Sequence, residues 1–201
     1  DDVLTRINLG AGAPEYRGQL QAAVVEHTIL PLLERALRRA ECQAAQLVGM
    51  VVAGNTTMLH LLAGVDPTPM GVAPFAAPFL ESRVLRAGEL SPRLGPAEMP
   101  VCLLPSAAAY LGADVVGGVL ATGLADEQGP SLLVDVGTNG EIVLQHQGRL
   151  VGCATAAGPA FEGSRLTAGM RAGRGAISRL CLHADGRLEY EVIGDVPAIG
   201  L

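Results

Sequence analysis

The sequence contains no lysine, and all fourteen of its basic residues are arginine. A P-loop ATPase needs a lysine that reaches the phosphates, and Schiff-base chemistry needs a lysine amine, so both classes are excluded. Tryptophan is absent and aromatic residues make up only 3% of the chain, which argues against a platform for stacked bases. The net charge is −6, and the basic cluster Arg35, Arg38 and Arg39 is typical of a solvated helix face. We therefore expect no nucleic-acid partner.

Long apolar runs and paired cysteines are also missing. Gly, Pro, Asp or Arg interrupts each apolar stretch before it reaches the roughly 18 residues of a membrane span, and no signal-peptide pattern is present. The cysteines form no C-x-x-C pair, which argues against a zinc site or an iron–sulfur cluster within this chain. We expect no membrane partner, a cytoplasmic location, and free thiols at Cys42, Cys102, Cys153 and Cys181.

The first part of the chain alternates helices and short strands. Residues 19–39 predict an amphipathic helix because apolar positions recur at three- and four-residue spacing. The Val-rich run 47–53 predicts a buried strand that ends at Gly54. Asn55 or Thr56 is suited to cap the helix that follows. The inward positions expected in the first helix are Leu20, Val24, His27, Leu30, Leu33 and Leu37.

A proline-rich stretch separates these elements from the next strand. Residues 67–78 predict an irregular, packed loop. Residues 99–104 predict a short strand, and Pro105 and Ser106 then predict the start of a helix over 107–124. The polar stretch 125–130 is the best candidate for a boundary, which divides the chain into lobes at 1–128 and 129–201.

The second part predicts strands joined by tight turns, at 131–136, 141–145 and 149–154. Asn139-Gly140 favours a type I′ hairpin turn, because both central residues need positive φ, and Gln147-Gly148 marks the next turn. A further hairpin is expected over 177–193 around Asp185-Gly186. Strand–helix alternation followed by a β-meander predicts an α/β protein with mixed sheets.

The stretch from Asp135 to Glu141 is the most informative for function. A strand places the Asp135 carboxylate at its end, and the chain then turns through Gly137, Thr138, Asn139 and Gly140. Successive N–H groups in such a turn point inward and bind an anion, and the two glycines let a phosphate approach the backbone. Asp135 would hold Mg²⁺ through water. An ordinary hairpin with a polar tip is the alternative.

This turn resembles the second phosphate motif of the superfamily of acetate and sugar kinases, heat-shock chaperones and actin. Three more segments resemble superfamily steps in the expected order: the strand-to-helix step at 51–58, the interlobe helix at 104–112 and the glycine-rich step at 155–163. More narrowly, the chain resembles the reductive activators of corrinoid-dependent methyl-transfer proteins over nearly its whole length. The motifs are G-N-T-T-M-L-H-L-L (54–62), A-P-F (73–75), D-V-G-T-N-G-E-I-V-L (135–144), A-A-G-P-A-F-E-G (156–163) and G-M-R-A (169–172).

The resemblance implies a ribonuclease H-like (actin-like ATPase) fold, with parts of two lobes and mixed sheets. It implies ATP and Mg²⁺ as cofactors and a corrinoid protein as partner. In that family, ATP binding or hydrolysis supports uphill electron transfer to an inactive Co(II) corrinoid. The electron comes from an amino-terminal 2Fe–2S ferredoxin domain, and the Co(I) product accepts methyl groups again.

The resemblance also implies a set of site residues. Glu141 and Glu162 are candidates to position water or Mg²⁺. The residues themselves leave alternatives: Glu141 facing solvent, Glu162 capping a helix or orienting the hairpin, and Asn55 and Thr56 only capping a helix. His60 is expected to be a satisfied core histidine. The nucleotide-binding candidates are Asp135, Gly137, Thr138, Asn139, Gly140, Asn55, Thr56 and Gly158.

The sequence departs from the family in several ways. The first phosphate motif, the adenosine-binding glycine segment and the ferredoxin domain are not found, and Ala154 stands where a serine is expected. We therefore expect about half of a nucleotide cleft, inactive alone, whose open sheet edges pair with another chain as a homo-oligomer. One alternative is a module with an incomplete nucleotide site that docks a corrinoid protein or itself. Another is a small-molecule kinase, which lacks a sugar- or acetate-binding signature.

Overall fold

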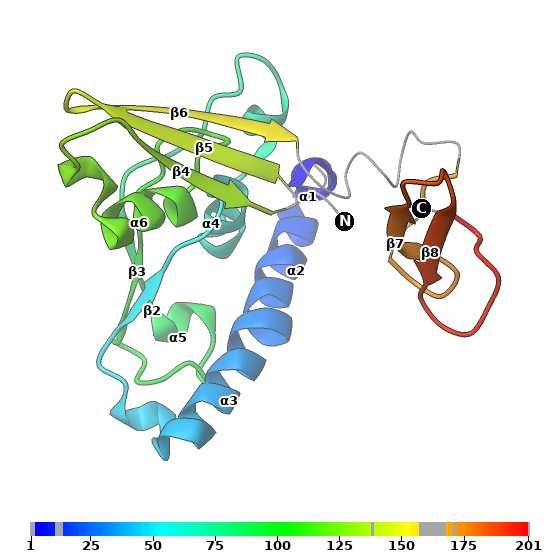
Figure 1. Cartoon of the computed structure of the whole chain (residues 1–201). Coiled ribbons are helices and arrows are strands. Elements are labelled where there is room, and N and C mark those ends of the chain that lie inside the picture. The colour runs from blue at the N-terminus through cyan, green and yellow to red at the C-terminus, as the bar shows by residue number, and fades with distance from the viewer. Residues whose placement is uncertain (1–2, 11–13, 138, 157–167, 171, 201) are drawn as a thin grey trace. The chain divides into compact units, whose positions relative to one another are not determined.

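The computed structural model describes residues 3–10, 14–137, 139–156, 168–170 and 172–200 (Figure 1). The chain separates into two compact units: Asp1–Leu133 with Ile142–Cys153, and Val134–Glu141 with Ala154–Leu201. The hairpin Val134–Glu141 thus groups with the later residues, while the strands that continue from it group with the earlier ones. The predicted lobe boundary at 128/129 stays a prediction.

Helices and short strands alternate in the first part of the chain, and strands dominate the rest. Among the described residues, no helix combines the length and apolar character needed to cross a lipid bilayer. The elements are α1 (Val3–Gly10), α2 (Pro14–Val24), η1 (Val25–Ile29), α3 (Leu30–Ala40), η2 (Ala44–Gln46), β1 (Met50–Val52), α4 (Thr56–Leu62), η3 (Thr68–Gly71), β2 (Arg83–Arg86), α5 (Ala87–Leu90), β3 (Pro100–Leu103), α6 (Ala113–Thr122), η4 (Leu124–Asp126), β4 (Ser131–Val136), β5 (Asn139–His146), β6 (Arg149–Ala156), β7 (Ile177–Leu182) and β8 (Leu188–Val192).

The first sheet is mixed, as predicted. Its order is β1-β3-β2, with β1 parallel and β2 antiparallel to β3. One face carries Val101 and Leu103, both fully buried, into a core shared with α3 and α4. The strand predicted over 47–53 is present but spans only 50–52, and its predicted burial is wrong at Val51, which is 68% exposed. Val51 lies on the opposite sheet face from the core, since strand side chains alternate.

A π-helical turn interrupts the long helix that was predicted over 19–39. Helical structure runs from Pro14 to Ala40, and the N–H of Leu30 donates to the carbonyl of Val25 within this π turn. Pro31 follows directly, and a proline within a helix clashes with the carbonyl four residues before it, which a wider turn relieves. The extra residue also shifts the inward face. His27 is therefore exposed rather than inward and Val25 is buried, whereas Leu30 is buried as predicted.

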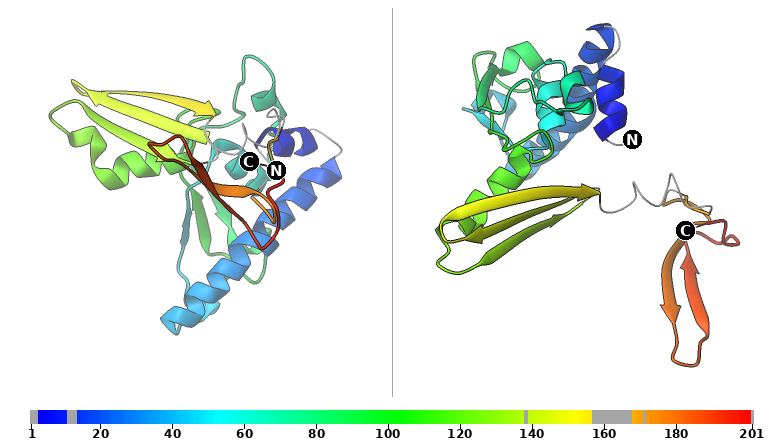
Figure 2. Two further views of the ribbon diagram at one scale, coloured as in Figure 1. Left: turned by 45° about the vertical axis from the view of Figure 1, so that its right-hand side comes forward. Right: turned by 90° about the horizontal axis from the view of Figure 1, so that it is seen from above.

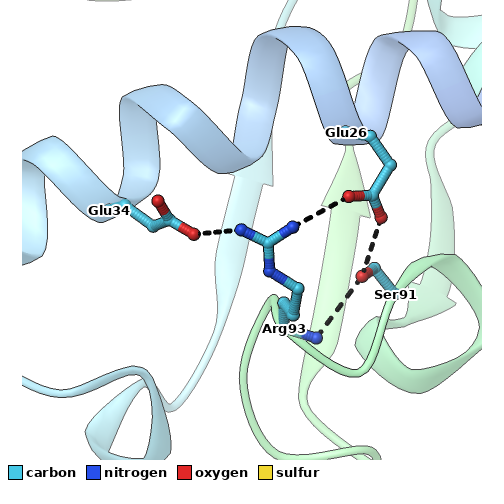
Figure 3. A network of polar contacts seen from close by, with 4 residues as sticks. All are labelled: Glu26, Glu34, Ser91 and Arg93. Carbon is cyan, nitrogen blue, oxygen red and sulfur yellow. Dashed lines mark hydrogen bonds and ion pairs between the residues drawn. The ribbon is translucent and has the colours of Figure 1, made fainter.

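Arg93, in the loop after α5, connects that loop to this helix by ion pairs (Figure 3). The Arg93 guanidinium pairs with Glu26 at 3.0 Å and with Glu34, and the Ser91 hydroxyl donates to Glu26 at 3.2 Å. Two α-helical turns span about 7 residues, and the π turn adds roughly one more. Glu26 and Glu34, eight residues apart, therefore face the same side and are bridged by one guanidinium.

The helix predicted over 107–124 is present but shorter, as α6 (Ala113–Thr122). Residues 107–112 form a turn, with a bridge between Ala108 and Leu111, and α6 begins only at Ala113. Its residues Val115 and Val119 pack with Val143 and neighbouring side chains. Figure 2 shows α6 running along the strands that provide these contacts. The strand β2 and the short helix α5 were not predicted.

The predicted meander and final hairpin are present. The strands β4, β5 and β6 form one sheet in that order, and β7 pairs antiparallel with β8. Gln147 and Gly148 have φ values of 52° and 72°, which confirms the predicted turn. The prediction that Asn139 and Gly140 form the first turn is wrong, because β5 already begins at Asn139. The Gly137 N–H donates to the Asn139 carbonyl at 3.0 Å.

Gly112 lies against the Gly54–Asn55 turn with no room for a side chain. A Cβ at this position would lie 2.5 Å from the Asn55 Cα and 2.8 Å from the Gly54 carbonyl oxygen. We predict that Gly112→Ala lowers the free energy of unfolding by about 1–3 kcal/mol, because backbone must move to relieve the overlap. The urea midpoint of the purified chain measures this.

Gly118 in the same helix is the matched control. A Cβ there would meet only Leu133 methyl groups, at an ordinary 3.7 Å. Gly118→Ala should therefore stabilise the protein by up to about 1 kcal/mol through helix propensity. Equal effects of the two substitutions would contradict the close approach at Gly112.

His60 is fully buried in α4, as expected for a core histidine. Its Nδ1 lies 2.7 Å from the Thr56 carbonyl, and its Nε2 accepts from the Phe79 N–H at 3.3 Å. The two rings stack with centroids 4.0 Å apart. These partners require a neutral ring with the proton on Nδ1. Burial, chiefly, lowers the pKa of His60 below its ordinary 6.5.

A histidine with a lowered pKa makes stability depend on pH. The stability contribution is therefore complete above the unfolded pKa of about 6.5. Below that pH the unfolded chain takes up a proton that the folded protein resists, so stability falls as the pH drops from about 6.5 toward the folded pKa. We predict that the wild type loses more stability than His60→Gln between pH 7.5 and 5.0. Glutamine is neutral throughout and offers both a donor and an acceptor. Parallel urea-midpoint curves for the two proteins would show that His60 does not contribute this dependence.

Candidate functional site

The turn after β1 is the first candidate segment. Parallel strands β1 and β3 end at the same sheet edge, with Val52 paired to Leu103, and ligands of open α/β sheets bind at such carboxyl ends. The Gly54 carbonyl accepts from the N–H groups of Ala113 at 2.9 Å and Asp114 at 3.4 Å. The end of β1 and the starts of α4 and α6 therefore meet here.

The side chains of the predicted nucleotide residues of this turn both make hydrogen bonds within the protein. The Asn55 side chain accepts from the Met58 N–H at 2.9 Å and caps α4. The Thr56 hydroxyl is buried and donates to the Ala108 carbonyl at 2.7 Å. The capping alternative is thus present in the structure for Asn55, and Thr56 ties α4 to the turn at 108–111. Their nucleotide contacts stay a prediction.

The approach of Ala108 and Gly112 to this turn was not foreseen from the sequence. The expected helix over 107–124 would have carried both residues away along its axis. The signal that opposes such a helix is Gly112, since glycine is a poor interior helix residue. In the structure Gly112 directly precedes α6, and it has extended backbone.

The second candidate segment is the end of the β4–β5 hairpin, Val134–Glu141, which belongs to the other compact unit. Asp135 is exposed near the end of β4, Asn139 is half-buried and Gly140 is buried. Glu141 is half-buried in β5. The Gly137 amide donates within the hairpin, to the Asn139 carbonyl, so one of the amides predicted to face phosphate is engaged locally. Thr138 lies outside the described residues.

The remaining predicted residues, Gly158 and Glu162, also lie outside the described residues. Over the part of the chain that the structure describes, no group of three or more His, Cys, Asp or Glu side chains is placed to hold a metal ion. All four cysteines are free. The predicted site residues that the structure describes therefore lie on two separate segments of the chain, 55–56 and 135–141.

Comparison with known families matches the chain twice. Residues 1–127 match the RACo middle region, and residues 129–201 match the C-terminal domain of RACo, the ASKHA domain. The second match confirms the predicted superfamily of acetate and sugar kinases, heat-shock proteins and actin.

Two individual relatives agree with these family matches. The chain is 32% identical over 193 residues to the corrinoid activation enzyme RamQ of Eubacterium limosum, covering 96% of this chain and 32% of the relative. It is 26% identical over 162 residues to a Co(II) methylated amine-specific corrinoid protein reductase of Methanosarcina barkeri, covering 77% of this chain and 30% of that protein.

A solved structure is also similar. The reductive activator for corrinoid,iron-sulfur protein superposes over 100% of this chain and 32% of its own, with 37% identity and a TM-score of 0.75. The chain thus spans about a third of the length of these three proteins. Because the two family matches follow each other along the chain at 1–127 and 129–201, this protein belongs to the RACo family of ASKHA-domain proteins.

Proposed function

We propose that the polypeptide containing this chain reductively activates corrinoid proteins with ATP, converting the Co(II) form to Co(I). The observation that carries this proposal is the likeness of the whole chain to a third of a reductive activator, at 37% identity. Two further relatives are named for corrinoid activation and for reduction of a Co(II) corrinoid protein. Since this chain spans only a third of them, the electron donor is proposed to lie elsewhere in the polypeptide.

The proposed reaction adds one electron to the corrinoid cobalt. Its donor would be the 2Fe–2S ferredoxin domain expected in longer members, and ATP would supply the free energy for the uphill transfer. The residues of this chain would bind and orient the nucleotide and dock the corrinoid protein. Free thiols at all four cysteines agree with the reducing cytoplasm that we propose as its location.

The hairpin at 135–141 suits a magnesium nucleotide by the chemical type of its residues. Asp135 is exposed, and carboxylates with water are the usual protein ligands of Mg²⁺. Among the described residues, a Cβ at Gly137 would meet the Asn139 carbonyl oxygen, at an ordinary contact distance of 3.5 Å. Glu141 and Glu162 are proposed to position water or Mg²⁺ for attack at the phosphate.

A docking module with an incomplete nucleotide site is the second candidate. The hydrogen bonds that Asn55, Thr56 and the Gly137 amide make within the protein favour it, because each occupies a group that the nucleotide site would use. In this case the chain would still recognise the corrinoid protein, and ATP would act elsewhere or not at all.

We also propose self-association. The strand β1 is an end strand of its sheet, and an apolar groove lies beside it, lined by Leu32 and Leu33 of α3 and by Met50 and Val51. Unpaired strand edges accept a further strand. A single species of monomer mass in sedimentation would contradict a homo-oligomer.

The nucleotide proposal predicts that Asp135→Asn weakens Mg²⁺-ATP binding by the whole polypeptide about tenfold or more, because a charged metal contact is lost. Isothermal titration calorimetry with Mg²⁺-ATP measures the affinity. Asp126→Asn removes the same charge from an exposed residue of η4 and should leave it unchanged. If Asp135→Asn binds like the wild type, Asp135 does not belong to the site.

Two substitutions at Asn55 separate capping from nucleotide binding. Aspartate caps a helix about as well as asparagine, whereas Asn55→Ala should cost about 1 kcal/mol of stability. A carboxylate beside phosphate would repel it, so Asn55→Asp should keep the urea midpoint but weaken Mg²⁺-ATP binding. Unchanged affinity in Asn55→Asp would restrict Asn55 to the capping role.

A further inference from the structure

The Thr56 side chain is fully buried although it carries a hydroxyl group. Its exposed fraction is 1%, and the hydroxyl donates to the Ala108 carbonyl at 2.7 Å. A buried hydroxyl costs free energy unless it is hydrogen-bonded, and valine would fill the same space without needing a partner. Packing therefore explains a branched side chain at this position, whereas the bond to Ala108 explains a threonine. The proton of this hydroxyl is used inside the protein rather than on a ligand.

The turn that receives this bond is closed by its own hydrogen bonds. The Ala108 carbonyl also accepts from the Leu111 N–H at 3.2 Å. The Leu111 carbonyl accepts from the N–H groups of Ala107 at 2.8 Å and Ala108 at 3.1 Å. A carbonyl oxygen has two lone pairs, so Thr56 and Leu111 together occupy the Ala108 acceptor. The Thr56 hydroxyl is therefore attached to a turn whose residues hold one another, with Leu111 at its end.

Leu111 extends this attachment to the sheet of β4, β5 and β6. Its side chain packs in the cluster that contains Val115 of α6 and Val143 of β5. It also lies directly on the backbone of β6, because a Cβ at Gly152 would be 2.9 Å from the Leu111 Cδ1. Glycine inside a strand often marks a place where another group approaches closely. Leu111 therefore joins the turn at 108–111 to these strands.

The strand β5 continues from these contacts to the predicted phosphate turn. It runs from Asn139 to His146, and its first two residues, Asn139 and Gly140, are nucleotide candidates. Val143, which belongs to the cluster with Leu111, follows them in the same strand. A hydrogen bond and a side-chain contact therefore lead from Thr56 to the strand on which these candidates lie.

A parallel attachment runs through α6. The Gly54 carbonyl accepts from the Ala113 N–H at 2.9 Å, and α6 begins at Ala113. This helix packs Val115 and Val119 into the same cluster as Val143. Together the attachments restrain rotations that either alone would allow. The turn at 54–56 and the later part of β5, from Ile142, are thus held in a defined relation within one compact unit.

We propose that Thr56 is a positioning residue of the nucleotide site, which acts on β5 through the turn at 108–111 and Leu111. This inference rests on the proposed function, because it assigns a role at the Mg²⁺-ATP site. The Thr56 hydroxyl contacts Ala108 instead of the nucleotide, and this bond fixes the strand on which Asn139 and Gly140 lie. A site that is ordered before its ligand arrives loses less entropy on binding. Loss of the bond therefore lowers nucleotide affinity without removing a ligand of the nucleotide.

The test measures the Mg²⁺-ATP affinity of the whole polypeptide by isothermal titration calorimetry. Thr56→Val keeps the shape of the side chain and removes the hydroxyl, whereas Leu111→Ala removes the contact with β6 and leaves Thr56 intact. Each should raise the Kd about three- to tenfold. Thr56→Ser retains the hydroxyl and should bind like the wild type. Thr122→Val is the matched control, since the Thr122 hydroxyl donates to the Gly118 carbonyl at 2.8 Å within its own helix.

The double variant Thr56→Val/Leu111→Ala separates positioning from direct contact. Residues that act through one connection are non-additive, so the double variant should bind about as tightly as the weaker of the two single variants. A direct contact between Thr56 and the nucleotide would instead give losses that multiply. If Leu111→Ala does not fold, Gly152→Ala replaces it, because a Cβ there must displace a Leu111 methyl group. Without nucleotide, amide hydrogen exchange in β5 should be faster in Thr56→Val than in Thr122→Val.

The outcomes distinguish this inference from the proposed function. Non-additive losses, retained binding in Thr56→Ser and faster exchange in β5 support positioning through Leu111. Losses that multiply place the Thr56 hydroxyl on the nucleotide, and unchanged affinity in Thr56→Val removes Thr56 from the site. Either of these results overturns the positioning role and leaves the proposed function intact. A wild type that does not bind Mg²⁺-ATP overturns the ATP part of the proposed function and this inference with it.

Discussion

The contact between Gly112 and the Gly54–Asn55 turn holds the end of the first sheet together. Parallel pairing of β1 with β3 brings the chain after each strand to one sheet edge. Only a residue without a side chain fits there, since a Cβ would lie 2.5 Å from the Asn55 Cα. The Gly54 carbonyl then receives the first N–H groups of α6. The cap of α4, the start of α6 and the position of Thr56 all follow from this approach.

The helix cap and the turn that were predicted correctly each depend on a few neighbouring residues. The Gly54-Asn55 step after a strand gave a correct helix cap, and Gln147-Gly148 gave a correct turn, because each depends on the conformations open to one or two residues. Periodicity failed where the helix departs from regular α geometry. The π turn before Pro31 leaves His27 exposed and buries Val25, whereas Leu30 is buried as predicted.

The candidate site was predicted less well for a related reason. Residue types identified the segments 54–57 and 135–141, and the family comparisons support the kind of protein to which they belong. The partners of each side chain depend on the fold: Asn55 caps α4, and Thr56 reaches Ala108, fifty-two positions away in the sequence. The turn at 139–140 was misplaced because the dipeptide Asn-Gly favours a turn wherever it occurs, whereas strand pairing places it at the start of β5.

The same contacts join the Gly54–Asn55 turn to two neighbouring segments. Thr56 donates to the turn that carries Tyr110, and His60, one helical turn after Thr56, accepts from the Phe79 N–H. Because Thr56 and His60 both belong to the short helix α4, a shift of this helix would act on both attachments at once.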